Sequence, residues 1–156
     1  MHPIGIIHTR FTSLEEMPIQ PAGARDERAE IVIDPKYTEG LKDLDGFSHL
    51  YLIYRFHLSD GYALTVTPFL DKKPRGLFAT RAPRRPNPIG LSLVRLEKVQ
   101  DNRMSVFGAD VIDGTPLLDI KPYVPAFDGV EDAKSGWVSA SKDQLADKRS
   151  DRRFAD

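Results

Sequence analysis

A segment rich in proline and arginine, residues 78–92, is the strongest constraint on how this chain can fold. It carries three prolines and three arginines and lies between two apolar runs. Each proline fixes its own φ angle, lacks an N–H group and pushes the preceding residue toward an extended conformation, which excludes a helix across residues 83–88. The segment is therefore predicted to be a stiff loop.

The side chains of this loop suit a ligand that carries negative charge. Planar guanidinium groups match the geometry of phosphate and carboxylate, and loops with fixed polar groups often carry function. The polar side chains are Arg81, Arg84, Arg85 and Asn87. We expect the arginines to be splayed from the stiff backbone as an anion or nucleotide site; ordinary solvated surface charge is the alternative.

Short strand-like runs fill most of the remaining chain. Alternating or branched apolar residues predict strands at 4–7, 28–33, 47–58, 63–67, 76–79, 91–99, 104–109 and 117–121. One helix is predicted at 34–44, because Asp34 can cap it, Pro35 suits its first turn and Gly46 would stop it. Many short strands with one short helix predict a mainly β fold, a small closed or nearly closed barrel.

Composition limits the class of protein. A chain of 156 residues with 40% hydrophobic content predicts one compact domain, assigned to residues 1–127 and followed by a charged, partly mobile extension at 128–156 in which Trp137 is the expected docking point. The net charge of −1 excludes a global basic field, so any nucleic-acid binding needs a local patch. The absence of cysteine excludes disulfides and thiolate chemistry. Without an apolar span or a leader, we expect a cytoplasmic protein and no membrane partner.

Two familiar kinds of site are not predicted. No glycine-rich dinucleotide turn follows a strand and there is no Walker A lysine loop, so an ordinary Rossmann fold is disfavoured. His49 and His57 share one predicted strand, which at about 3.3 Å per residue separates them by about 26 Å, too far to share a metal. His2 and His8 bracket the first strand without a carboxylate cluster, so no metal site is predicted.

Three ordered segments resemble the signature blocks of the TsaA-like (TrmO) family. They are residues 46–50 (GFSHL), 78–92 (FATRAPRRPNPIGLS) and 110–123 (DVIDGTPLLDIKPY), within a resemblance that runs from residue 4 to about residue 125. The resemblance implies a small β-barrel methyltransferase that uses S-adenosylmethionine. In characterised members the substrate is a threonylcarbamoylated adenosine beside a tRNA anticodon, and the resemblance also implies a homodimer with the cofactor near its two-fold interface.

The resemblance also implies which residues bind the cofactor. Expected to line the S-adenosylmethionine pocket are Gln20, Pro21, Ala22, His57, Leu58, Arg81, Leu91, Phe107, Gly108, Ala109 and Asp110. The first loop departs from the family pattern, because residues 18–22 (PIQPA) lack the arginine of a Pro-Arg-Gln-Pro-Gly-like loop and the glycine moves to Gly23. His57 should lie at a barrel rim, where a structural hydrogen bond is the alternative role.

The acidic residues of the third segment receive different expectations. Asp113 and Gly114 form a pair that favours a tight turn, so Asp113 is predicted to be a turn residue. Asp110 and Asp119 flank that turn and could accept hydrogen bonds from ribose hydroxyls or an α-amino group. Arg81 either meets the cofactor or is a buried structural partner of Asp110.

Methyl transfer from a sulfonium is an in-line displacement, so the protein must mainly align the reactants and exclude water. Our hypothesis is that Arg81 and Asp110 hold the cofactor, while Arg84, Arg85 and Asn87 receive RNA or the carboxylate of the modified base. Two other functions stay open at this point. One is methylation of a small carboxylate-bearing metabolite, and the other is nucleic-acid binding without catalysis.

Overall fold

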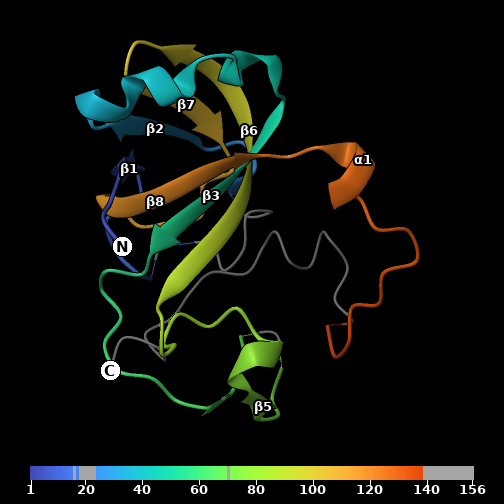
Figure 1. Cartoon of the computed structure of the whole chain (residues 1–156). Helices are drawn as coiled ribbons and strands as arrows, with labels where there is room; N and C mark the ends of the chain where they lie inside the picture. The colour runs from blue at the N-terminus through green and yellow to red at the C-terminus, as the bar shows by residue number, and fades with distance from the viewer. Residues whose placement is uncertain (16, 18–23, 70, 139–156) are drawn as a thin grey trace.

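The computed structural model describes residues 1–15, 17, 24–69 and 71–138 and shows a closed antiparallel barrel (Figure 1). Within these residues the barrel order is β1-β2-β7-β6-β3-β8, which confirms the mainly β prediction. The barrel strands are β1 (Gly5–His8), β2 (Arg28–Ile33), β3 (His49–Arg55), β6 (Ile89–Gln100), β7 (Arg103–Phe107) and β8 (Thr115–Pro122).

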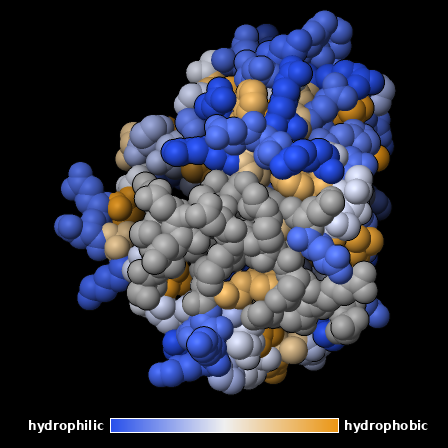
Figure 2. Space-filling view, turned by 180° about the vertical axis from the view of Figure 1, so that it is seen from behind, coloured by the Kyte–Doolittle hydropathy of each residue, from blue (hydrophilic) through white to orange (hydrophobic). Residues whose placement is uncertain are grey.

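Alternation along each strand builds the core. Successive side chains of a strand point to opposite faces, and the inward residues Ile31, Leu52 and Val106 are completely buried. Burial of one such aliphatic side chain contributes about 1.5–3 kcal/mol. The outward positions are mixed, with exposed Ile6, Leu91 and Leu93 among polar residues, and the barrel end at the top of Figure 2 is largely hydrophilic on the face drawn there.

The strand predicted at 47–58 is shorter in the structure. It ends at Arg55 because the chain turns there: Phe56 N donates to Pro88 O at 2.8 Å and Ser59 N donates to Phe56 O at 3.1 Å. His57 therefore lies in a turn after β3 and not on the same strand as His49. The expected separation of these two histidines along one strand was wrong.

The predicted helix at 34–44 forms as two short 3-10 helices, η2 (Pro35–Leu41) and η3 (Leu44–Gly46). The predicted cap is confirmed, because the Asp34 carboxylate accepts a hydrogen bond from Lys36 N at 3.3 Å. Asp43 adopts a left-handed conformation with φ 64°, which interrupts the helical path and separates the two segments.

Residues 57–88 form a lobe at one end of the barrel, which we call the distal lobe (Figure 1, bottom). Its strands β4 (Thr65–Val66) and β5 (Arg75–Gly76) pair with each other and not with the barrel. The strands predicted at 63–67 and 76–79 are correspondingly short. After Gly76 the chain enters the 3-10 helix η4 (Leu77–Ala79), because Thr80 N and Thr80 Oγ1 both donate to Leu77 O, at 3.0 and 2.7 Å.

The segment after the helix α1 (Pro125–Asp128) returns to this lobe. Trp137 Nε1 donates to Ala79 O at 2.8 Å, and the Arg75 guanidinium lies 5.4 Å from the centre of the indole ring. The predicted docking role of Trp137 is therefore confirmed. The predicted mobility of the last dozen residues concerns positions outside the described residues. No described helix is long and apolar enough to span a membrane.

Candidate functional site

Strand pairing brings segments that are distant in sequence to the barrel end next to the distal lobe. β3 enters the lobe and β6 leaves it, with Tyr54 opposite Gly90. The chain that follows β7 continues beside β6, where it is joined to Ser92 through the side chain of Asp110. The end of β3, the start of β6 and residues 107–110 therefore meet at one place.

A buried chain of hydrogen bonds links three of these segments. Ser92 Oγ donates to Asp110 Oδ1 at 2.5 Å, and the Tyr54 hydroxyl lies 3.0 Å from Ser92 Oγ. A serine hydroxyl has one proton to donate. Because that proton goes to Asp110, the Tyr54 hydroxyl donates to Ser92. Tyr54 and Ser92 are 3% and 1% exposed, so water does not compete for either bond.

The absence of a side chain at Gly90 leaves room for the Tyr54 ring. A Cβ atom at position 90 would lie 2.2 Å from the Tyr54 ring, well inside van der Waals contact. Phe56 packs against the same ring edge-on, with 5.5 Å between ring centres. The Tyr54 ring is therefore clamped between β6 and Phe56, which fixes the direction of its hydroxyl.

Burial sets the protonation states of Asp110 and Tyr54. It raises the pKa of Asp110 to about 6, although the Ser92 hydrogen bond and the positive charge of Arg81 act in the opposite direction. Burial also raises the pKa of Tyr54, which keeps the phenol protonated as a donor. At neutral pH the site therefore holds a poorly solvated carboxylate.

Arg81 is the cation that acts on this carboxylate. Its side chain is exposed, which contradicts the alternative of a buried structural pair with Asp110. Its positive charge nevertheless lowers the pKa values of both Asp110 and Tyr54, so Arg81 is close enough to the site to act on both groups. An exposed arginine whose charge acts on a half-buried carboxylate can help to hold a ligand at that carboxylate.

The turn after β3 holds two more of the predicted cofactor residues, His57 and Leu58. Leu58 is 55% exposed, and His57 is half-buried with its pKa lowered by burial and by the charge of Arg55. The neutral imidazole is therefore the favoured form at pH 7. Next to them, Ser59 Oγ is buried without a hydrogen-bond partner among the described residues. A buried polar atom of this kind is costly unless a ligand or water satisfies it.

Of the other predicted cofactor residues, the structure describes Leu91 in β6 and residues 107–109 at the end of β7. Leu91 is half exposed on the outer face of β6, while Gly108 follows β7 with φ +95°, a conformation that favours glycine. Ala109 is buried, and Phe107 lies under the Arg95 guanidinium at 4.4 Å. Residues 107–109 therefore lead from β7 to Asp110. Gln20, Pro21 and Ala22 fall outside the described residues.

The arginines of the proline-rich loop are less splayed than expected. Arg85 is half-buried and donates to Thr80 O at 3.0 Å and to Ala82 O at 3.3 Å, so part of its guanidinium braces the loop. Arg84 is also half-buried and lies against Gly61, where a Cβ atom would be 3.7 Å from its NH2 group. Asn87 is exposed. The sequence indicated a stiff loop but not that its own carbonyls would bind an arginine.

The two remaining acidic candidates lie elsewhere. Asp113 is a turn residue as predicted: Asp113 Oδ1 lies 3.2 Å from His8 Nδ1 and accepts a hydrogen bond from Thr9 N at 3.1 Å, and Gly114 has φ +78°. Asp119 lies within β8, where it pairs with Lys121 at 3.0 Å and is not joined to Asp110. In the described ranges, no three His, Cys, Asp or Glu side chains gather closely enough to hold a metal ion.

Sequence reasoning missed Tyr54, Ser92 and Ser59 as members of the site. A signal for two of them was present, because alternation places Tyr54 on the inward face and a buried tyrosine hydroxyl needs a partner. Ser92 is a small polar residue at an inward position of β6. Their pairing spans 38 residues and depends on strand register, which the sequence pattern does not specify.

Comparison with known proteins gives consistent matches. The family described as tRNA-methyltransferase O N-terminal domain matches residues 6–129. A probable S-adenosyl-L-methionine-binding protein of Pyrococcus abyssi is 47% identical over 97% of this chain and 83% of its own length. The tRNA (adenine(37)-N6)-methyltransferase of Escherichia coli K12 is 35% identical over 88% of this chain and 63% of its own length.

Solved structures agree with these matches. The crystal structure of TrmO from Pseudomonas aeruginosa superimposes with a TM-score of 0.73 at 40% identity. The superposition covers 87% of this chain and 60% of the crystallised chain, so the present chain spans well under two thirds of that relative. The signature segments, the barrel and the matched range together identify this chain as a member of the tRNA-methyltransferase O N-terminal domain family.

Proposed function

We propose that this protein is an S-adenosylmethionine-dependent tRNA methyltransferase that methylates N6 of a threonylcarbamoylated adenosine beside the anticodon. Family membership supports the cofactor and the reaction class. One structural observation carries the site: the hydrogen bond from Ser92, the last residue of the second signature segment, to Asp110, the first residue of the third. The bond joins the two segments at a carboxylate on which the charge of Arg81 acts.

The residues at this barrel end fit S-adenosylmethionine. That cofactor carries a sulfonium and an ammonium group together with an apolar purine face. The Asp110 carboxylate is poorly solvated and would be stabilised by a cation. Leu58 and Leu91 offer exposed apolar surface, and the unpartnered Ser59 Oγ offers a hydroxyl for a ligand hydrogen bond.

When bound, the cofactor supplies an electrophilic methyl group. The protein's contribution is alignment and exclusion of water. Asp110, held in one orientation by Ser92 and Tyr54, binds the cationic or hydroxyl groups of the ligand, and Arg81 closes the side that faces solvent. Leu58 and Leu91 cover the apolar part. The acceptor nitrogen loses a proton, a step that the electron-withdrawing carbamoyl substituent makes easier.

The substrate side of the proposal uses the proline-rich loop. Arg84, Arg85 and Asn87 receive the RNA or the carboxylate of the modified base. Arg85 donates hydrogen bonds to Thr80 O and Ala82 O from one of its nitrogens, but a guanidinium has five N–H donors, so others stay available for a ligand. The remaining donors of the loop exceed what one carboxylate can accept by bidentate pairing, which favours RNA over a small metabolite.

A homodimer and a cytoplasmic location complete the proposal. The family resemblance supports the dimer, and the outward side chains Leu91 and Leu93 of β6, which are 50% and 38% exposed, give it an apolar strip to use. Sedimentation at working concentration is expected to show a dimer. A monomer under all conditions would remove this part without affecting the reaction class.

Two experiments separate this proposal from its rivals. S-adenosylmethionine should raise the melting temperature, since a ligand that binds only the folded state stabilises it; a barrel that binds nucleic acid without catalysis would not respond. Radiolabelled methyl groups should then pass to total tRNA and not to a tRNA-free metabolite extract. Labelling of a metabolite alone would establish the small-molecule alternative.

A further inference from the structure

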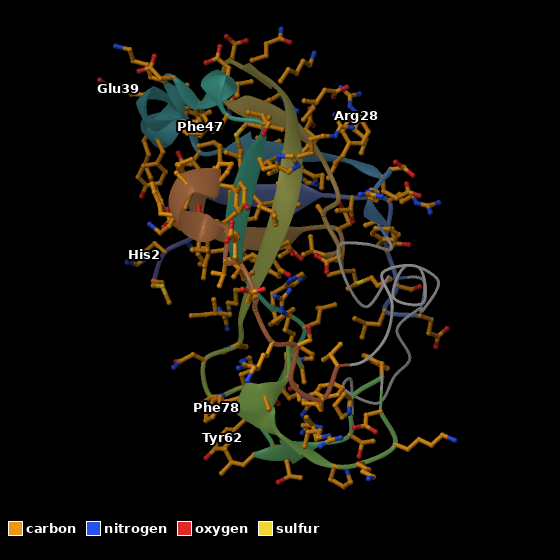
Figure 3. All side chains as sticks on the ribbon, turned by 90° about the vertical axis from the view of Figure 1, so that its right-hand side faces the viewer. His2, Arg28, Glu39, Phe47, Tyr62 and Phe78 are labelled. Carbon is orange, nitrogen blue, oxygen red and sulfur yellow. The ribbon has the colours of Figure 1, made fainter. Side chains whose placement is uncertain are left out.

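Large apolar side chains that face solvent gather on the distal lobe. Tyr62, Leu64 and Phe78 are 59%, 61% and 75% exposed. Figure 3 shows Tyr62 and Phe78 at the end of the molecule opposite Glu39 and Phe47. Three large, exposed apolar side chains on one small lobe are unusual for a surface that meets only water.

The same lobe concentrates positive charge. Residues 57–88 contain six arginines and lysines and two aspartates, a net charge of +4, in a chain whose total is −1. Asp71 neutralises only part of this charge, through its ion pair with Arg75. The lobe therefore attracts anions even though the whole protein does not.

The arginines of the lobe stand beside its aromatic residues. The Arg85 guanidinium lies 5.7 Å from the centre of the Phe78 ring, within cation–π range. Arg84 lies against Gly61, the residue that precedes Tyr62. Hydrogen bonds from Arg85 to Thr80 O and Ala82 O fix the loop under Phe78, and Phe78 itself belongs to η4. The ring is therefore held in place while most of its surface stays exposed.

We propose that Phe78 and Tyr62 form a surface on which unpaired bases of an RNA loop stack, with the neighbouring arginines on the phosphates. Proteins that bind single-stranded RNA combine these two elements, because every base has a π face and every nucleotide a charge. This inference rests on the proposed function and deepens it by naming the residues that hold RNA outside the reaction centre.

Charge argues against a contact between the lobes of two copies of the chain. Two lobes that met across a two-fold axis would repel each other, because each carries a net charge of +4. An anticodon loop instead brings phosphates to the arginines and splayed bases to the rings. Charge complementarity therefore favours RNA.

The test compares ring removal with charge removal. Phe78→Leu and Tyr62→Leu keep an apolar side chain but lose the aromatic face, and Phe127→Leu is a matched control because Phe127 is 76% exposed outside the lobe. tRNA affinity is measured across a salt series by filter binding, with melting temperature and S-adenosylmethionine binding as controls for folding.

The Phe78 and Tyr62 variants should each bind tRNA at least about fivefold more weakly, since stacking on an aromatic side chain is worth about 1–3 kcal/mol per base. The slope of log affinity against log salt should stay that of the wild type, because no phosphate contact is lost. Phe127→Leu should bind normally.

Three results would overturn the inference, each in a distinguishable way. If both ring variants bind and methylate tRNA like the wild type, the stacking surface is wrong while the proposed function stands. If they convert a dimer into a monomer in sedimentation, the lobe is a self-association face. If the wild type neither binds nor methylates tRNA, the proposed tRNA substrate fails and the stacking surface with it.

Discussion

Two opposing effects act on the proton of Asp110. Burial favours the neutral acid, whereas the Ser92 hydrogen bond and the Arg81 charge favour the carboxylate. Burial is the larger effect and raises the pKa to about 6. The folded state therefore holds this proton more tightly than the unfolded chain, whose carboxyl titrates near 4.

This difference predicts a pH-dependent stability. The contribution of protonated Asp110 is fully present below about pH 4 and is lost as the pH rises through about 6, a change of about 3 kcal/mol at about 1.4 kcal/mol per unit. Asp110→Asn keeps an acceptor for Ser92 but does not titrate. Chemical denaturation from pH 4 to 8 should show the wild type losing stability relative to the variant, whereas a constant difference would contradict the buried carboxyl.

Arg81 gives a second prediction at the scale of one residue. Its side chain is exposed, so Arg81→Ala should cost little thermal stability. Because the charge of Arg81 acts on the Asp110 carboxylate, S-adenosylmethionine should bind the variant more weakly in calorimetry. The matched control is Arg103→Ala, which removes an exposed arginine of β7 that pairs with Glu30 of β2. Unchanged cofactor affinity in Arg81→Ala would refute the assigned role.

The packing of strand β6 against Tyr54 requires that position 90 has no side chain. Gly90→Ala would place a Cβ atom 2.2 Å from the Tyr54 ring, so either the ring or β6 must move. Overpacking of this kind costs about 1–3 kcal/mol. Gly76→Ala, in β5, has nothing within 4 Å of the new atom and should be neutral or slightly stabilising. Equal unfolding midpoints for the two variants would contradict the packing around Tyr54.

The strands and their inward faces could be predicted because the alternation of apolar and polar residues is a pattern between sequence neighbours. The range 28–33 matches β2, and the inward positions of β3 are those that alternation assigned. Irregularities were not predictable in the same way. β6 and β7 shift register between Leu96 and Lys98, and residues 77–79 turn because Thr80 caps them. Such features depend on pairs of residues and not on a periodic pattern.

The candidate site was predictable only in part. The resemblance selected positions 91 and 107–110. Residues 107–110 lead from β7 to Asp110, whose side chain meets Ser92, the residue after Leu91 in β6. The contacts that give the site its chemistry join Tyr54, Ser92 and Asp110, residues separated by 38 and 18 positions. Closure of the barrel brings them together, and no local pattern encodes that closure.

For the whole molecule, charge is distributed unevenly. With −1 in total and +4 in the distal lobe, the rest of the chain carries −5. A polyanion should therefore approach the lobe and avoid much of the barrel. RNA would then reach the protein beside the reaction centre, because the lobe connects directly to the ends of β3 and β6.

Salt dependence tests this orientation. Replacement of both Arg84 and Arg85 by Ala should weaken tRNA binding and reduce the slope of log affinity against log salt by about two, roughly one per lost phosphate contact. S-adenosylmethionine binding should persist. The control is the double variant Lys98→Ala with Arg103→Ala, which removes two cations from the barrel strands β6 and β7. An equal change of slope in both double variants would show that tRNA does not prefer the lobe.

Mass analysis of digested tRNA measures directly whether the protein transfers a methyl group to one modified nucleoside. The protein is incubated with S-adenosylmethionine and tRNA from cells that make or lack the threonylcarbamoyl modification. We predict that threonylcarbamoyladenosine gains the mass of one methyl group, that its unmethylated form is depleted, and that tRNA without the modification is unchanged. Methylation of both tRNA pools at another nucleoside, or of neither, would contradict the proposed reaction.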